Sequence, residues 1–315
     1  MARTALVLGA GIGGIVAAET LRKLLPPQDR VGVVERERNH VFAPSLLWHM
    51  TGENDAAAFT RPLSALKSKG IELVTGDIRR IDPAALSVEV DGKTLIGDAM
   101  VVALGADYAP EAIPGLAESG HNLYTLAGAE EIRAALDSFK GGRIVVLTAA
   151  PAYKCPAAPY EAAMLVDAYC KKRKLPQSTE VAIYAAEPAP MPVTGPVVGA
   201  QIKMMLEKKG IAYSPARQVA KVESGTLHFA DGAATNFDLL LYVPPHRAPA
   251  VVKQAGLCAD SGWISVDRET METQFPNVYA LGDVTSIPLK MGRPLPKAGV
   301  FANGQAQVVA KNIAR

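Results

Sequence analysis

The chain has 315 residues, of which 20% are charged, and a net charge of +2. This length can bury two sizeable cores, so it predicts two domains. Lys and Arg are scattered along the chain, apart from a cluster at residues 171–174 that is typical of a helix C-terminus. This distribution argues against a nucleic-acid partner. No apolar run approaches the length of a membrane span, and the first strand-like run begins too near Met1 for a signal peptide. We therefore expect a cytoplasmic protein.

A glycine-rich turn joins a strand-like run, residues 5–8, to a helix-like pattern over residues 15–25. Its glycines at fingerprint spacing are Gly9, Gly11 and Gly14. The first allows a tight turn, the second lets the backbone approach a pyrophosphate, and the third lets helix and strand pack closely. The next strand-like run ends at Glu35, where a carboxylate can accept hydrogen bonds from both ribose hydroxyls. Together these features predict a dinucleotide-binding unit.

A second strand-to-helix turn has the opposite character. Residues 143–148 are strand-like, residues 162–169 are helix-like, and the connection between them contains no glycine. It carries Cys155 among prolines, whereas a pyridine nucleotide would need a glycine loop at this place. The following strand ends near Glu187, where a nicotinamide-binding unit would keep its ribose acid. The turn indicates a thiol site, and a buried inert cysteine is the alternative for Cys155 taken alone.

Two apolar runs closed by glycine turns complete the first pattern. Residues 99–104 end at Gly105, and residues 278–281 lead to Asp283. Both elements resemble the FAD-binding half of two-dinucleotide-domain flavoproteins, in which the late aspartate bonds to the ribityl and phosphate region of FAD. The resemblance implies this role for Asp283, and a simple turn aspartate is the alternative for that residue alone.

The order of these patterns predicts an α/β fold with two Rossmann-like domains, the second inserted in the first. Residues 1–110 and 246–315 would form a discontinuous FAD-binding domain. Residues 111–245 would form the second domain, which lacks the glycine loop.

Three segments carry a further resemblance: KCPAAPYE at residues 154–161, FAPSLLW at residues 42–48 and LPKAG at residues 295–299. They resemble elements of sulfide:quinone oxidoreductases and of the flavoprotein subunit of flavocytochrome c sulfide dehydrogenase. The first element is specific to that group, and the other two are shared more widely with type II NADH dehydrogenases. The resemblance covers the whole chain.

The resemblance assigns roles to individual residues. It implies that Cys155 attacks or carries sulfur at the flavin, with Lys154 or a nearby helix N-terminus lowering the pKa of the thiol. Glu161 becomes a candidate for proton handling, and is equally an acid favoured by a helix N-terminus. The LPKAG turn, with Lys297, opens a helix whose positive end would lie under the flavin pyrimidine.

The sequence departs from that group in several places. Tyr124 stands where members often have a cysteine, and Ala43 lies where flavocytochrome-type members attach FAD covalently, so we expect non-covalent FAD. The sequence stops at Arg315, before the C-terminal segment that usually carries the second redox cysteine in that group, so either the sequence is truncated or the protein works differently. Peripheral membrane contact would therefore need a longer C-terminus. Cys170 is not expected to replace the missing partner, since the ten helical residues from Tyr160 advance about 15 Å and a disulfide needs Cα atoms within about 7 Å. Cys258 precedes a strand-like run at residues 262–264 and is expected to be peripheral.

No His or Cys spacing is typical of a metal site, so no metal is expected. The sequence as a whole predicts a FAD-dependent oxidoreductase that oxidises sulfide or a related sulfur compound through Cys155. Electrons would pass to a quinone or another acceptor. One alternative is an NAD(P)H-dependent flavin oxidoreductase of the type II NADH dehydrogenase kind, against which the missing second glycine loop argues. The other is a FAD-binding subunit or remnant without catalysis.

Overall fold

The computed structural model describes residues 2–315 and divides into two compact units. The first unit is the described part of residues 1–40 with Arg61–Asp107 and Arg247–Arg315. The second unit is Val41–Thr60 with Tyr108–His246.

Residues Val41–Thr60 lie in the second unit, although we assigned them by sequence to the first domain. The reason is packing. Helix α2 (Leu46–Met50) contacts helices α5 (Leu126–Ser138) and α6 (Ala158–Lys172), and its apolar side chains join the buried core of the second unit.

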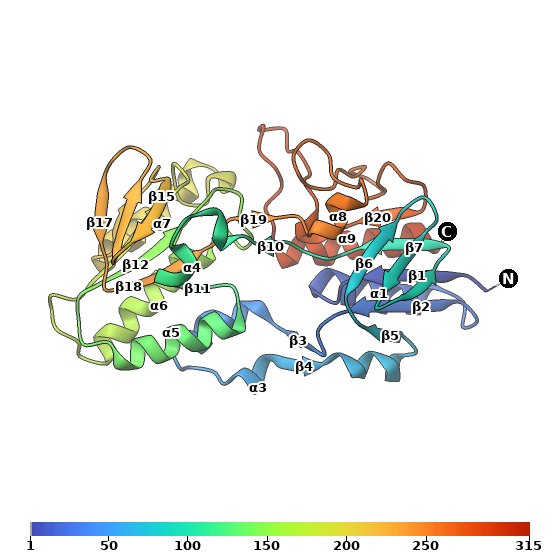
Figure 1. Cartoon of the computed structure of the whole chain (residues 1–315), viewed down its shortest axis with the longest axis horizontal. Coiled ribbons are helices and arrows are strands. Elements are labelled where there is room, and N and C mark those ends of the chain that lie inside the picture. The colour runs from blue at the N-terminus through green and yellow to red at the C-terminus, as the bar shows by residue number, and fades with distance from the viewer. Residues whose placement is uncertain (1) are drawn as a thin grey trace. The chain divides into compact units, whose positions relative to one another are not determined.

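The first unit contains a parallel sheet of five strands in the order β20-β9-β1-β2-β5. Figure 1 labels β20, β1, β2 and β5 of this sheet. The strands are β1 (Thr4–Leu8), β2 (Arg30–Glu35), β5 (Glu72–Thr75), β9 (Ala99–Val102) and β20 (Val278–Ala280). Alternate residues of β1 face opposite sides, as the pleat requires. Ala5 and Val7 join the core formed with helices α1 (Ile12–Leu24) and α9 (Gly299–Ile313).

The other face of this sheet packs against a different set of elements. Leu6 and Leu8 join a core with an antiparallel sheet of three strands and with the short helix α8 (Ala250–Gln254). Those strands are β6 (Ile78–Asp82), β7 (Ser87–Val90) and β8 (Lys93–Ile96). Burial on both faces explains the continuous apolar runs that mark these parallel strands in the sequence.

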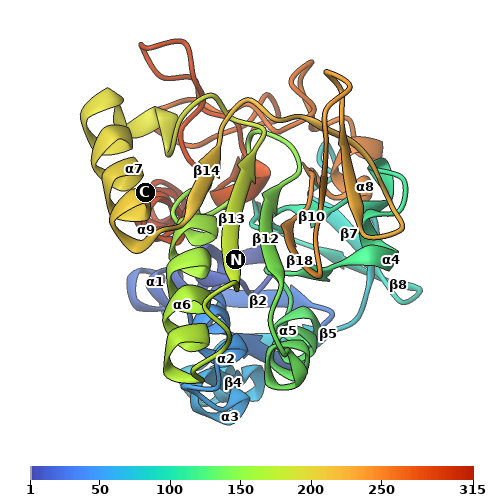
Figure 2. The same cartoon turned by 90° about the vertical axis from the view of Figure 1, so that its left-hand side faces the viewer.

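The second unit repeats this plan. Its parallel sheet has the order β11-β18-β12-β13-β14 (Figure 2). The strands are β11 (His121–Asn122), β12 (Arg143–Thr148), β13 (Glu180–Ala185), β14 (Ala212–Ser214) and β18 (Leu239–Val243). Helices α5, α6 and α7 (Pro196–Lys209) pack in the core that contains Ile144 and Val146. Val145 and Leu147 face the antiparallel strands β15 (Val219–Glu223), β16 (Thr226–Phe229) and β17 (Ala234–Asn236). The predicted α/β class with two Rossmann-like sheets is therefore confirmed.

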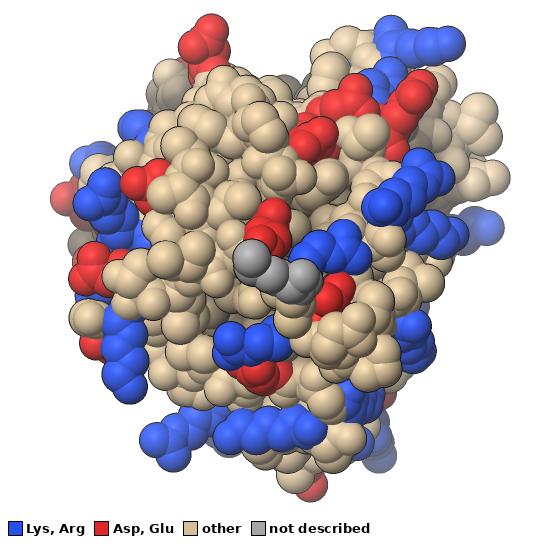
Figure 3. Space-filling model, turned by 90° about the vertical axis from the view of Figure 1, so that its right-hand side faces the viewer, with Lys and Arg blue, Asp and Glu red and all other residues tan. Residues whose placement is uncertain are grey.

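Short elements connect these layers. The strands among them are β3 (Asn39–Val41), β4 (Thr60–Pro62), β10 (Asp107–Tyr108) and β19 (His246–Arg247). The short helices are η1 (Ala43–Ser45), α3 (Ala56–Phe59), η2 (Leu63–Lys69), η3 (Pro110–Ala112), α4 (Leu116–Ser119), η4 (Pro192–Thr194) and η5 (Gly282–Val284). Across residues 2–315, no helix has both the length and the apolar character that crossing a bilayer requires. Acidic and basic side chains are both scattered over the face shown in Figure 3.

Candidate functional site

In the glycine turn between β1 and α1, two glycines leave no room for a side chain and the third faces open space. Gly9 has φ +99°, and a Cβ on it would lie 2.5 Å from the carbonyl oxygen of Ala103. A Cβ on Gly14 would lie 1.9 Å from the carbonyl oxygen of Gly9. A Cβ on Gly11, by contrast, would meet no protein atom of the described chain within 4 Å. Gly11 is the N-cap of α1, so this open space lies at a helix N-terminus, which suits a pyrophosphate.

Glu35 lies at the end of β2 and its carboxylate is held at the glycine turn. Oε2 accepts a hydrogen bond from the backbone N–H of Ala10 at 2.7 Å, and Oε1 accepts one from that of Glu37 at 3.1 Å. A carboxylate can accept about four hydrogen bonds, so Glu35 keeps capacity for ribose hydroxyls.

Lys297 and the Asp283 turn come together within the first unit. Nζ of Lys297 donates to the carbonyl oxygens of Asp283 at 2.7 Å and of Thr285 at 2.9 Å. The same ammonium lies 3.4 Å from the centre of the Trp263 ring. Burial lowers the pKa of Lys297 to about 8, and the negative charge of Asp283 opposes that shift. Sequence reasoning missed Trp263.

The predicted FAD residues share one edge of one sheet. Gly105 follows β9, Asp283 follows β20, and the glycine turn and Glu35 follow β1 and β2, which are neighbours in the order β20-β9-β1-β2. The carboxyl edge of a parallel sheet is where such folds bind nucleotides. With an open helix N-terminus and an acid at the next strand, this edge fits FAD.

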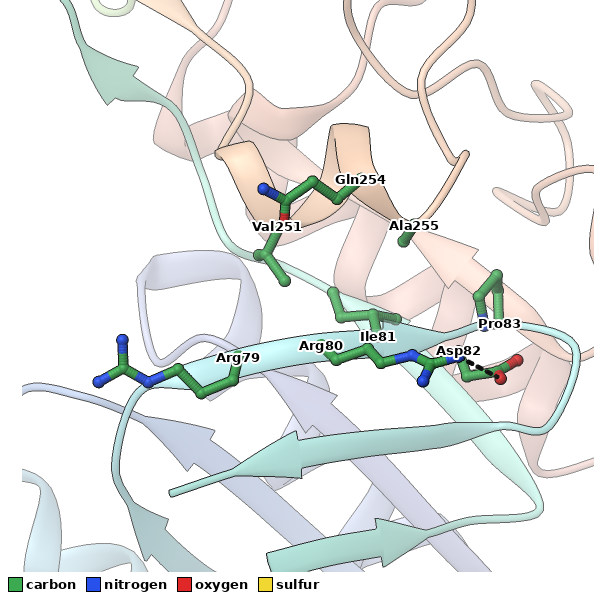
Figure 4. Close-up of a pocket in the computed structure, with 8 residues that line it drawn as sticks. All are labelled: Arg79, Arg80, Ile81, Asp82, Pro83, Val251, Gln254 and Ala255. Atoms are coloured by element: carbon green, nitrogen blue, oxygen red, sulfur yellow. Dashed lines mark ion pairs between the residues drawn. The ribbon is translucent and has the colours of Figure 1, made fainter. Parts of the chain in front are cut away.

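A separate hollow of about 240 Å³ lies in the first unit between β6 and α8. Figure 4 shows that Ile81, Val251 and Ala255 point toward it, that Arg79 points away and that Arg80 turns to Asp82. Both arginines already have carboxylate partners, since Arg79 pairs with Asp77 at 3.3 Å and Arg80 with Asp82 at 3.6 Å. We assign no ligand to this hollow.

Cys155 lies in the second unit on the loop between β12 and α6. Its side chain is exposed, and its backbone has φ +49°, a left-handed conformation that costs a non-glycine residue about 1 kcal/mol or more. Its carbonyl oxygen accepts from the N–H of Ala158, the first residue of α6, at 2.9 Å. Cys170 is buried, and burial raises the pKa of its thiol to about 11, with Asp167 adding to the shift. Cys258 is half-buried, and burial raises the pKa of that thiol too.

Lys154 lies against a cluster of aromatic rings. Its ammonium is 4.7 Å from the ring centre of Tyr108 and 5.9 Å from that of Tyr124. The Tyr124 hydroxyl donates to the carbonyl oxygen of Lys154 at 2.6 Å and lies 3.4 Å from that of Cys155. The His246 ring packs edge-on against both tyrosines. Tyr124, which the sequence marked only as a departure, is therefore a direct neighbour of the cysteine loop.

Glu161 occupies the first turn of α6 and is exposed. This position suits an acid near a helix N-terminus.

Glu187 is a buried carboxylate whose oxygens face the interior of the second unit. It is 4% exposed, and its Oε2 accepts from the hydroxyl of Thr148 at 2.6 Å. Oε1 accepts from Tyr153 at 2.5 Å and from Tyr160 at 2.7 Å. Burial, and then the charge of Glu187, raise the pKa of both phenols above the ordinary value. The two tyrosines flank Cys155 in the sequence, and sequence reasoning missed both of them.

Comparisons with known proteins agree with this architecture. The family described as pyridine nucleotide-disulphide oxidoreductase matches residues 3–306. The mitochondrial sulfide:quinone oxidoreductase of Mus musculus is 25% identical over 304 residues, and the match covers 90% of this chain and 66% of that protein. The type II NADH:quinone oxidoreductase of Staphylococcus aureus is 24% identical, with 98% of this chain and 81% of that protein covered.

A solved structure shows the same fold. The sulfide:quinone oxidoreductase of the bacterium Aquifex aeolicus matches with a TM-score of 0.88 at 23% identity, covering 99% of this chain and 76% of that one. Together, the family match, the curated relatives and this structure confirm the resemblance to sulfide:quinone oxidoreductases that was seen first in three short segments. The chain spans 66% of the length of the mouse protein. Since the family match extends over nearly all of the chain, the protein belongs to the pyridine nucleotide-disulphide oxidoreductase family.

Proposed function

We propose that this protein oxidises sulfide, or a related small sulfur compound, at Cys155 and passes the electrons through FAD to a quinone or another acceptor. One observation carries the proposal: the exposed thiol of Cys155 occupies the turn where a second dinucleotide unit would have its glycine loop. The sulfide:quinone oxidoreductases among the relatives support the sulfur substrate, and all three named relatives support a quinone acceptor.

The chemistry at Cys155 is the formation of one S–S bond. When the Cys155 thiol and hydrogen sulfide join, two protons and two electrons leave the sulfur atoms. Bound FAD supplies a two-electron acceptor for that pair. A second nucleophile of the thiol class must then take the outer sulfur from Cys155, which returns the residue to its thiol form.

The neighbours of Cys155 would favour its reactive form. A thiolate is the competent nucleophile, and a positive charge nearby favours it. We assign this role to Lys154 and to the N-terminus of α6. Glu161, exposed in the first turn of α6, is our candidate to receive a proton as sulfide reacts.

The FAD-binding assignments belong to the first unit. We propose that Gly9, Gly11 and Gly14 shape the pyrophosphate site and that Glu35 accepts from the ribose. Asp283 would contact the ribityl and phosphate region, with Gly105 on the neighbouring strand end. Lys297 would supply positive charge at the same edge of the sheet. We expect FAD to be held without a covalent link, since Ala43, at the position where flavocytochrome-type members attach it, is not a cysteine.

The leading alternative is NAD(P)H oxidation, which the relative from Staphylococcus aureus favours. Two observations oppose it. The loop before α6 offers prolines rather than glycines, and a proline adds bulk and has no N–H to donate to a pyrophosphate. Glu187, where a ribose acid would stand, already accepts three hydroxyl hydrogen bonds from its own unit.

The deciding experiment is anaerobic stopped-flow bleaching of the flavin by sulfide. We expect Cys155→Ala to keep FAD and its fold while losing at least about 90% of the bleaching rate, because the covalent route is removed. Direct attack of sulfide on the flavin leaves a slow residual rate. Cys170→Ala is the matched control, since Cys170 is the buried thiol of the same unit. A Cys155→Ala protein as fast as wild type would remove the case for sulfur chemistry.

A further inference from the structure

The loop between β12 and α6 is anchored by hydrogen bonds just before Cys155 and at Cys155 itself. The hydroxyl of Tyr153, two residues before Cys155, donates a hydrogen bond to Oε1 of Glu187 at 2.5 Å. The carbonyl oxygen of Lys154 accepts from the hydroxyl of Tyr124 at 2.6 Å. The carbonyl oxygen of Cys155 accepts from the N–H of Ala158. Each of the three consecutive residues from Tyr153 to Cys155 is therefore held by a hydrogen bond.

Tyr153 is the hydroxyl donor to Glu187 that belongs to this loop. Of the three hydroxyls on Glu187, that of Thr148 belongs to β12 and that of Tyr160 to α6, and only Tyr153 lies between those elements. Its side chain is 8% exposed, so a lost hydrogen bond would not be replaced freely by water.

Cys155 needs such an anchor because its backbone is strained. A left-handed non-glycine residue persists only where its surroundings hold it there. Its thiol is exposed, so packing alone does not set the sulfur position. Productive attack, in contrast, requires a defined sulfur position.

We propose that Tyr153, through its hydrogen bond to Glu187, is a positioning residue that fixes how the Cys155 thiol is presented. The buried carboxylate of Glu187, which follows β13, thus helps to hold the loop that carries Cys155. This inference rests on the proposed function of Cys155, but its test measures the thiol itself.

Tyr153→Phe and Tyr160→Phe form a matched pair. Each removes one hydroxyl from the same oxygen of Glu187 and keeps the ring, so both should lower stability by similar amounts. Only Tyr153 lies on the loop. A purely structural role for the carboxylate predicts equal effects of the two changes, whereas positioning of the thiol predicts that they differ.

The measurement is the rate of alkylation of Cys155 by iodoacetamide in the FAD-bound protein, between about pH 6 and pH 10 around the ordinary thiol pKa. Cys170→Ala and Cys258→Ala form the background, so that only one thiol reacts. We expect Tyr153→Phe to change the alkylation rate of Cys155 by about tenfold, because the loss of one buried hydrogen bond allows a change of that size. The change would appear either in the plateau rate or, through a shifted midpoint of the pH profile, in the rate at neutral pH. Tyr160→Phe should stay within about twofold, inside the range of a minor change in stability.

Equal alkylation profiles for the two Phe variants would overturn the proposal. If Tyr153→Phe does not yield folded flavoprotein, Glu187→Gln replaces it, since it weakens the same hydrogen bond and leaves the Tyr153 hydroxyl in place. The alkylation profile of Cys155 should then differ from that of the Cys170→Ala, Cys258→Ala background, and an unchanged profile would overturn the proposal. Failure of sulfide oxidation itself would appear separately, as equal bleaching of wild type and Cys155→Ala.

Discussion

The turn from β1 to α1 and the turn from β12 to α6 occupy the same place in two similarly built units, yet they present different chemistry. The first exposes backbone at Gly11, and its acid, Glu35, accepts from the N–H of Ala10 in the turn. The second exposes the thiol of Cys155, and its acid, Glu187, accepts from side-chain hydroxyls in the interior. One framework can therefore offer either backbone donors for an anion or a single nucleophile, according to which residues fill the turn.

The largest expected effect lies in the glycine turn. Gly14→Ala would bring a Cβ to 1.9 Å from a backbone oxygen, so we expect loss of folded, yellow protein. Gly11→Ala is the matched control, because its Cβ meets no described protein atom within 4 Å. That variant should fold but bind FAD at least about tenfold more weakly, as a ligand pyrophosphate needs the space. FAD titration of the apoprotein and thermal melting measure both. Normal FAD affinity in Gly11→Ala would separate the turn from cofactor binding.

The second prediction concerns the turn without glycine. Stoichiometric NADH or NADPH should leave the flavin oxidised under anaerobic conditions while sulfide bleaches it. The prolines of the loop and the occupied carboxylate of Glu187 both disfavour a second dinucleotide. Absorbance near the flavin band follows the reaction. Rapid bleaching by NADH would make the two turns functionally alike and would favour the dehydrogenase alternative.

The smallest effect concerns the backbone of the cysteine turn. Cys155→Gly and Cys155→Ala both lack the thiol, so the difference between their unfolding free energies reports the cost of the left-handed backbone conformation. We expect the Gly variant to be more stable by about 0.5–1 kcal/mol, since glycine adopts φ +49° without a Cβ penalty but loses more chain entropy. Urea unfolding measures this difference. An Ala variant that is the more stable of the two would show that the loop relaxes once the sulfur is gone.

Much of the fold could be predicted from the sequence because local signals agree with one another. Continuous apolar runs such as Val31–Val34 mark strands buried on both faces, and the spacing from Gly9 to Gly14 marks the turn that follows β1. The segment Val41–Thr60 was misassigned because membership of a unit depends on which distant helices it contacts.

The site was harder to predict for a similar reason. Cys155 stood out through its own neighbours in the sequence, whereas its anchors come from several elements. Tyr124 lies before α5 and Glu187 after β13, and nothing local to either residue indicates that it supports a distant loop. Trp263, stacked on Lys297, lacked a local signal in the same way.

The buried phenols around Glu187 also set an alkaline limit to the second unit. An exposed tyrosine ionises near pH 10, but burial and the adjacent carboxylate raise the pKa of Tyr153 and Tyr160 above that value in the folded chain. Above pH 10 the native state therefore holds more protons than the unfolded chain, so the stability present below that pH declines as the solution becomes more alkaline. Phenolate absorbance from these two rings would then accompany opening of the interior, which makes them a natural optical probe of the unit's cooperativity.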